Sequence, residues 1–345
     1  MHLLLKLTVS LGLVIGLLFT TNVTEVANTI QGSDYRYFAL ATAASLAGMC
    51  LAARRWQILL GRYEAGHGFR VLFRLIGLSY FYNFFVPGGI AGDLIRGFSC
   101  GTQRLSGIQG VASVVVDRII GLGSFVMLGL AGCVFSADAL AAVPAGSWLW
   151  VGLAGLTFGA CIGGGRIMGG ALRVLSKLSP VAGDQMNLLV DSICAYRRSG
   201  SLAGRAMAIS LLTAMINIGS FCLLGRAAGS DVGLIQFVLY VPVITVVSYL
   251  PISYSGLGIR ELCFMALFPQ VGMTAGQALA VPLLYFGMMM ILSLTGGLVY
   301  WVPRLAGAFG DVPSAGSSGC PAASATRSTG ASDDAKRTHD FGSPS

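Results

Sequence analysis

Three pairs of oppositely charged residues interrupt apolar stretches of this sequence. The pairs are Asp93 with Arg96, Asp117 with Arg118, and Arg260 with Glu261. A charge at the centre of a membrane helix costs about 2.5–3.5 kcal/mol, and such charges usually face a cavity and mark function. Arginine suits a phosphate group because its planar fork binds two oxygens at once. The carboxylates could hold the arginines, bind an amine or a sugar hydroxyl, or carry a proton.

A purely structural role is the alternative for each pair. Asp93 and Arg96 stand three positions apart, so they can form an ion pair on one helix face. Arg118 could lie near a helix end, with its guanidinium extended to the membrane surface.

Two of the pairs follow Pro- and Gly-rich breaks in long apolar segments, residues 71–95 and 232–270. The first break contains Asn83, Pro87, Gly88, Gly89 and Gly92, and the second contains Pro251, Ser253, Gly256 and Gly258. Proline removes a backbone donor and glycine accepts positive φ, so both stretches are expected to unwind. Unwound backbone within a bilayer is tolerated only where protein or a polar cavity surrounds it. The aromatic cluster from Tyr80 to Phe85 is better explained by packing than by ligand binding.

The two breaks also resemble each other. An ungapped alignment pairs Pro87 with Pro251, Gly92 with Gly256, Ile95 with Ile259 and Arg96 with Arg260. Paired interrupted segments in two halves of a transporter point to its binding site. An internal inverted repeat and a chance match both remain open from the sequence.

The composition identifies the elements that must position these residues. Hydrophobic residues make up 55% of the 345 and charged residues only 10%, too few charges to cover a water-facing surface. The net charge of +8 comes largely from short basic loops, which is how membrane proteins orient themselves, so no nucleic-acid partner is expected. The chain is therefore predicted to be an all-α, polytopic integral membrane helical bundle.

Apolar runs long enough to cross about 30 Å of hydrocarbon occur at several places. They are the N-terminal run through Phe19, read as a retained first span, and 37–53, 111–135, 147–165, 206–225 and 277–302. Basic segments 54–74 and 166–205 should both be cytoplasmic. This predicts a re-entrant or broken hairpin at 71–95 that enters and leaves from the cytoplasm, and it allows 232–270 to enter and leave from outside. Both termini are then cytoplasmic, in a bacterial-type inner membrane.

The remaining features exclude several kinds of site. The eight cysteines are scattered, and His2, His67 and His339 are far apart, so neither a metal nor a cofactor is expected. No nucleotide-binding loop and no nucleophile elbow is present. A surface helix is expected within 186–196. Residues 1–304 should form the transmembrane domain, and 305–345 a disordered cytoplasmic tail rich in small and polar residues.

With these motifs the chain resembles the transmembrane region of the lysylphosphatidylglycerol synthase family, also described as flippase-like. The resemblance is carried by Asn83 with 87–89 and 92–96, by Asp117-Arg118 followed by Gly121, and by 251–253 with 256–261. Ser255 stands where members often have a second glycine. The family's soluble aminoacyl-transferase domain is not expected in the short polar tail, so lipid aminoacylation is not implied.

The resemblance implies a flippase or transporter that moves a polar-headgroup lipid between leaflets. The lipid would be a glycolipid, an aminoacyl phospholipid or a hopanoid-type lipid, and the protein would not be an enzyme. The substrate-binding residues would be those of the two breaks and the three charged pairs. Two alternatives are a membrane lipid-modifying enzyme that uses Asp93, Asp117 and Glu261, and an accessory subunit that binds a lipid-synthesis enzyme through 166–205. The oligomeric state is left open.

Overall fold

The computed structural model describes residues 23–63, 66–86, 91–102, 105–135, 200–249 and 256–305, together with Gly12, Gly16 and Ser192. These residues fall in one compact unit, Met1–Pro313. They form α-helices and two short 3-10 turns, with no strand in these ranges beyond a single bridge between Thr102 and Leu105. The predicted all-α helical bundle is confirmed. The predicted span 147–165 and the surface helix within 186–196 lie outside the described residues except for Ser192, and the N-terminal run lies outside except for its two glycines.

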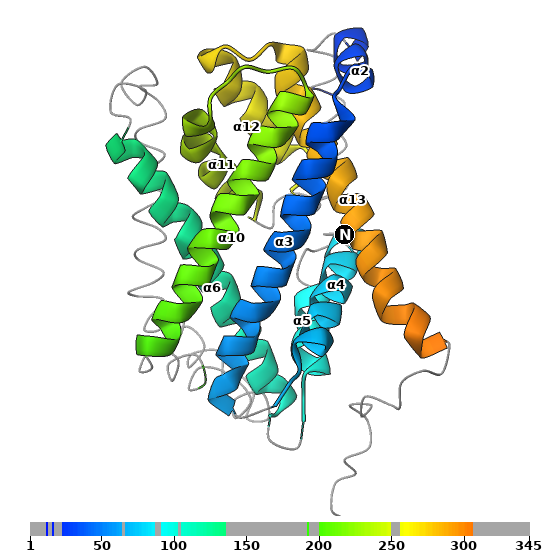
Figure 1. The fold of residues 1–345 in the computed structure, drawn as a ribbon, viewed down its shortest axis with the longest axis vertical. Helices are drawn as coiled ribbons and strands as arrows, with labels where there is room; N and C mark the ends of the chain where they lie inside the picture. Colours follow the sequence, from blue (N-terminus) through cyan, green and yellow to red (C-terminus); the bar gives the residue numbers. More distant parts are fainter. Residues whose placement is uncertain are drawn as a thin grey trace, which may run out of the picture. The chain divides into compact units, whose positions relative to one another are not determined.

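Four of the described helices are long and apolar enough to cross a membrane. They are α3 (Tyr35–Leu60), α6 (Gly107–Phe135), α10 (Gly200–Ala227) and α13 (Ala275–Leu305). Each contains one of the predicted runs and extends beyond it. The four helices are the long ribbons of the bundle in Figure 1, and their length and apolar composition are those of a multi-pass membrane protein. A short helix, α2 (Val23–Gln31), precedes α3.

The ends of α3 provide two reference points. We call the end where α3 begins the Tyr35 end; there the N–H of Asp34 donates to the carbonyl of Ala227 at the end of α10. We call the other the Leu60 end. Leu59 packs there with Leu202 near the start of α10.

The first break produces a helical hairpin. Helix α4 (Phe69–Phe85) ends before the Pro- and Gly-rich stretch, and α5 (Ala91–Ser99) begins after it. The N–H of Gly92 donates to Oδ1 of Asn83 at 2.9 Å, so α5 turns back along α4. Cys100, after α5, belongs to the same apolar cluster as Leu72 near the start of α4. Hairpin 1, defined as α4 with α5, therefore enters and leaves at the Leu60 end.

The second break produces a hairpin that opens at the Tyr35 end. Helix α11 (Leu234–Ser248) is followed by α12 (Ile259–Leu267) and a 3-10 turn (Phe268–Val271). The rings of Phe237 and Phe268, at the open end, lie 4.9 Å apart. We call α11 with α12 hairpin 2. The two hairpins occupy opposite ends of the bundle (Figure 1), as the charge-based topology predicts.

The residue-by-residue pairing of the two breaks does not extend to their backbones. Gly92 lies inside helix α5, whereas its aligned partner Gly256 has φ +79° and precedes α12. Arg96 lies in the last turn of α5, whereas Arg260 lies in the first turn of α12. The hairpins are opposed, but their aligned residues occupy different positions in them.

Glycines let hairpin 1 approach its neighbours closely. A Cβ built on Gly92 would lie 2.1 Å from the carbonyl oxygen of Ser79 on α4. A Cβ on Gly296 of α13 would lie 2.7 Å from the carbonyl oxygen of Gly77. These contacts leave no room for side chains, so the helices pack backbone to backbone around the charged residues.

Candidate functional site

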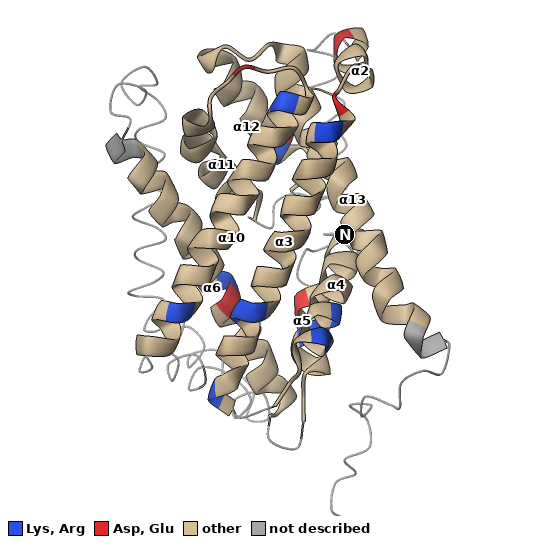
Figure 2. Cartoon of the chain, viewed as in Figure 1, with Lys and Arg blue, Asp and Glu red and all other residues tan. Residues whose placement is uncertain are grey.

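An alternating row of charged side chains joins α3, α6 and hairpin 1. Its members, in order, are Arg55, Asp117, Arg96, Asp93 and Arg118; we call this row the ion-pair chain. Nε of Arg55 lies 2.6 Å from Oδ1 of Asp117, and Nη2 of Arg96 lies 3.1 Å from Oδ2 of the same carboxylate. Nε of Arg96 lies 3.3 Å from Oδ1 of Asp93, and Nη2 of Arg118 lies 2.7 Å from Oδ2 of Asp93. Figure 2 shows acidic and basic positions beside one another near α5 and α6.

Further side chains contact Asp93, Arg55 and Arg96, although Nε of Arg96 makes no hydrogen bond within the described part of the chain. Ser79 of α4 donates to Asp93 at 3.1 Å, and Nη1 of Arg55 donates to the hydroxyl of Ser210 on α10 at 2.8 Å. Arg96 also lies over the ring of Trp56, 5.0 Å from its centroid. Neither carboxylate is therefore left as a bare charge, which burial in a low-dielectric interior requires.

The ion-pair chain becomes more exposed toward one end. The side chains of Arg55, Arg96 and Asp117 are 9%, 5% and 3% exposed, whereas that of Arg118 is 35% exposed. Because α6 begins at Gly107, Arg118 lies in the middle turns of a 29-residue helix. The alternative that Arg118 reaches the membrane surface from a helix end is therefore wrong.

Arg260 and Glu261 do not pair with each other. Oε2 of Glu261 accepts the N–H of Gly258 at 2.6 Å and caps its own helix. Its Oε1 has no hydrogen-bond partner among the described residues, although the side chain is buried. The guanidinium of Arg260 lies 4.7 Å from the centroid of Tyr285, and no carboxylate of the described ranges lies within ion-pair distance of it.

The tips of both hairpins contact the middle turns of spanning helices. For hairpin 1, the rings of Phe84 and Phe286 lie 4.9 Å apart. For hairpin 2, Arg118 of α6 lies 5.3 Å from the ring centroid of Tyr249, directly after α11. Because Phe286 and Arg118 both lie deep within long apolar helices, the two breaks occur at membrane depth.

The structure thus gathers part of the predicted site and separates the rest. It brings Asn83, Gly92, Asp93, Arg96, Asp117 and Arg118 into one network with hairpin 1. Gly256, Gly258, Arg260 and Glu261 belong to hairpin 2. Gly92 contributes its N–H and its lack of a side chain, which are structural roles. Pro87, Gly88, Gly89, Pro251 and Ser253 lie outside the described residues.

The expected position of Arg55 in a cytoplasmic loop is wrong. The predicted span ends near residue 53, but α3 continues to Leu60 and contains both Arg54 and Arg55. Arg54 is exposed and donates to Gln57, whereas Arg55 is buried and holds Asp117. The helical spacing of Trp56, Leu59 and Leu60 could have revealed that the helix continues past residue 53. These apolar residues share the buried side of α3 with Arg55.

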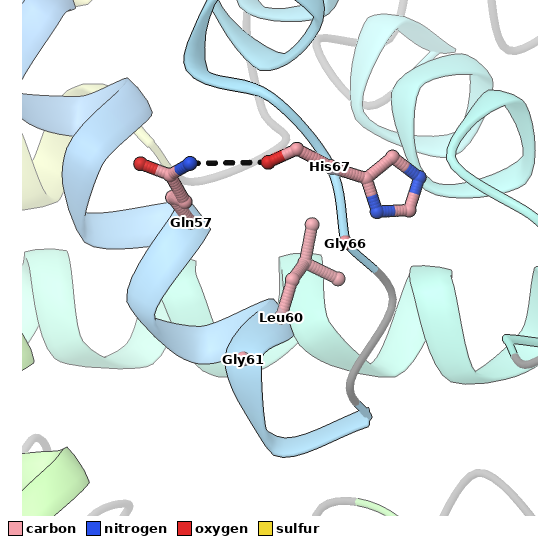
Figure 3. A pocket seen from close by; sticks show the side chains of 5 residues that line it. All are labelled: Gln57, Leu60, Gly61, Gly66 and His67. Carbon is pink, nitrogen blue, oxygen red and sulfur yellow. Dashed lines mark hydrogen bonds between the residues drawn. The ribbon is translucent and has the colours of Figure 1, made fainter.

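A small cavity lies apart from the ion-pair chain. It has a volume of about 210 Å³ and is lined by Gln57, Leu60, Gly61, Gly66 and His67. Figure 3 shows Gln57 donating to the backbone carbonyl of His67 across it. Burial lowers the pKa of His67, and a hydrogen bond with the backbone of Cys100 opposes this shift. Among the described residues, no three His, Cys, Asp or Glu side chains could hold a metal ion.

The arrangement favours an anion over a cation. Three arginines and two aspartates leave the ion-pair chain with one net positive charge, and the formal charges of Arg260 and Glu261 in hairpin 2 cancel. Positive charge in a low-dielectric interior attracts anionic groups strongly.

The family model described as "Lysylphosphatidylglycerol synthase TM region" matches residues 3–297. No curated protein and no solved structure matches the chain.

Proposed function

Because this chain belongs to the lysylphosphatidylglycerol synthase transmembrane-region family, whose name ties it to a membrane lipid, we propose that it moves a polar-headgroup lipid between leaflets. The lipid class is a glycolipid, an aminoacyl phospholipid or a hopanoid-type lipid. A polar headgroup cannot cross hydrocarbon cheaply without polar partners. A protein that transports it must present such partners at membrane depth.

One observation carries this proposal. Two hairpins that open at opposite ends of the bundle have their broken tips beside the middle turns of α6 and α13. The more exposed end of the ion-pair chain, Arg118, lies at this meeting point. Opposed broken segments around a central polar site are the arrangement expected for alternating access from the two sides.

The pairing of the carboxylates supports transport rather than catalysis. Asp93 and Asp117 are each held by two arginines, so neither is free to act as a base or a nucleophile. Glu261 caps a helix with one oxygen. A lipid-modifying enzyme would change the mass of a lipid, whereas a flippase changes only its leaflet.

The distribution of surface charge supports an orientation. Four exposed arginines lie toward the Leu60 end, namely Arg54, Arg62, Arg70 and Arg205, whereas the described part of the Tyr35 end carries Arg36 and Arg226. This bias supports a cytoplasmic Leu60 end, and the inner membrane is part of the same proposal.

The test is leaflet sidedness of candidate lipids, measured in a deletion strain and in proteoliposomes containing the purified protein. Lipid mass is measured in parallel. The deletion strain is expected to lose the normal leaflet distribution of the lipid without a change in lipid mass. Arg96→Ala and Arg260→Ala are expected to lose lipid translocation. If both variants translocate lipid normally, the site assignment is wrong; a change in lipid mass would instead indicate an enzyme.

A further inference from the structure

Two arginines at the meeting point of the hairpins are more exposed than the others and have fewer carboxylate partners than Arg96. Arg55 and Arg96 are buried and are held by carboxylates and by Ser210 or Trp56. Arg118 is 35% exposed and has one carboxylate partner, Asp93. Arg260 is half-buried and has no ion pair within the described part of the chain.

These two arginines lie beside the same helix end, although they come from different helices. The guanidinium carbon of Arg118 lies 5.3 Å from the ring centroid of Tyr249, the residue that follows α11. A Cβ built on Gly256 would lie 3.3 Å from Nη2 of Arg260 and 3.1 Å from Cβ of Ser248, the last residue of α11. Both guanidinium groups therefore border the carboxyl end of α11.

Aromatic rings hold both cations without neutralising them. Arg118 lies over Tyr249, and Arg260 lies over Tyr285 at 4.7 Å from the centroid. A cation–π contact orients a guanidinium but leaves its N–H donors and its charge available. Tyr249 is itself 53% exposed, so this side of the site is open.

We propose that Arg118 and Arg260 together bind the phosphate group of a lipid, with Asp93 occupying Arg118 when the site is empty. This inference rests on the proposed lipid transport and assigns the chemistry of the headgroup. Asp93 contacts Arg118 through Oδ2 alone, at 2.7 Å from Nη2 and 2.9 Å from Nε. A phosphate has more charge and more acceptor oxygens and can replace it, and Arg260 at the same end of α11 offers further donors.

The surroundings favour a lipid over free phosphate. Phe286, next to Tyr285, packs on Phe84, and the neighbouring Phe85 is 43% exposed. The exposed Met290 and Ile291 follow on α13. Acyl chains attached to a bound phosphate would therefore find apolar surface within reach.

The full chain is purified in nanodiscs, and equilibrium binding is measured with three probes: dioctanoyl phosphatidic acid, dioctanoylglycerol and inorganic phosphate. The phosphate lipid is expected to bind at least ~10-fold more tightly than dioctanoylglycerol. Arg118→Gln and Arg260→Gln should each weaken its binding ~10-fold, and Arg118→Lys by less. Asp93→Asn should tighten it several-fold, because it removes the competing carboxylate. Arg226→Gln, an exposed arginine at the Tyr35 end, is the matched control and should bind like the wild type.

Arg260→Gln breaks no ion pair of the described residues, so its result does not depend on the integrity of the ion-pair chain. Unchanged phosphatidic acid binding in Arg260→Gln and Arg118→Lys, with lowered thermal stability, would mean that the arginines only stabilise the carboxyl end of α11 and would overturn the proposal. Equal binding of inorganic phosphate and phosphatidic acid would overturn the lipid assignment.

This experiment separates the inference from the proposed function. Phosphate-dependent binding by a protein that moves no lipid in the sidedness assay would refute transport and leave the binding site in place. If the protein transports lipid but substitution of Arg118 and of Arg260 leaves phosphatidic acid binding unchanged, the binding site is refuted and the transport function is not.

Discussion

The guanidinium of Arg55 and the carboxylate of Asp117 lie 2.6 Å apart, although 62 positions separate them in the sequence. This contact joins α3 to α6 and continues through Arg96 into hairpin 1. Arg55, which lies close to a basic loop in the sequence, is therefore part of the membrane-embedded site.

Replacing Arg55 with alanine should therefore destabilise the protein and impair lipid transport. The change leaves Asp117 with a single ionic partner in a buried position, and breaking a buried pair costs about 3–5 kcal/mol. Thermal unfolding in detergent measures the loss.

The neighbouring Arg54 provides the control. It is exposed and interacts with Gln57 and the ring of Phe69, so Arg54→Ala should change stability by less than about 1 kcal/mol. Equal effects of the two substitutions would contradict the role given to Arg55.

Gly92→Ala should disturb hairpin 1 although it adds only one methyl group. The new Cβ would meet backbone atoms of Ser79, which cannot rotate away, so α5 must shift from α4. Overpacking of this kind costs about 1–3 kcal/mol, and displacement of Asp93 should also reduce transport. Gly219→Ala on α10, where a Cβ meets nothing within 4 Å, should be neutral or stabilising in the same unfolding and sidedness assays.

Glu261 should tolerate glutamine but not alanine. Its Oε2 accepts the N–H of Gly258, and a glutamine carbonyl can accept the same hydrogen bond. Glu261→Ala leaves that buried donor without a partner, at a cost of about 1–3 kcal/mol. Thermal unfolding compares the two variants. If glutamine keeps the fold but abolishes transport, the negative charge itself is required and capping is not its main role.

Cysteine labelling tests the orientation. In a background without native cysteines, Arg70→Cys at the Leu60 end should resist a membrane-impermeant maleimide in intact cells, and Asp231→Cys should react. The side chain of Asp231 is fully exposed at the Tyr35 end. The reverse labelling pattern would show that the proposed topology is inverted. Labelling of both cysteines in broken cells is the control that each thiol is accessible to the maleimide.

Local features of the sequence determined the membrane class and the two breaks. Long apolar runs require a lipid environment wherever they fold, and prolines and glycines end helices through their own backbone chemistry. The charge asymmetry of the loops was likewise sufficient to predict that the hairpins open at opposite ends, because orientation depends on where basic residues occur along the chain.

Only the tertiary structure decided which charges meet. Asp117 and Arg118 are adjacent in sequence, yet a helix directs neighbouring side chains about 100° apart, so they pair with different partners. Arg55 reaches Asp117 because Gly121, one turn further along α6, leaves room for its guanidinium: a Cβ built on Gly121 would lie 3.4 Å from Nη1 of Arg55. Arg260 stays unpaired among the described residues, although it aligns with Arg96, because α12 begins later relative to its break than α5 does. Such pairings depend on the distances between helices, which no local pattern in the sequence encodes.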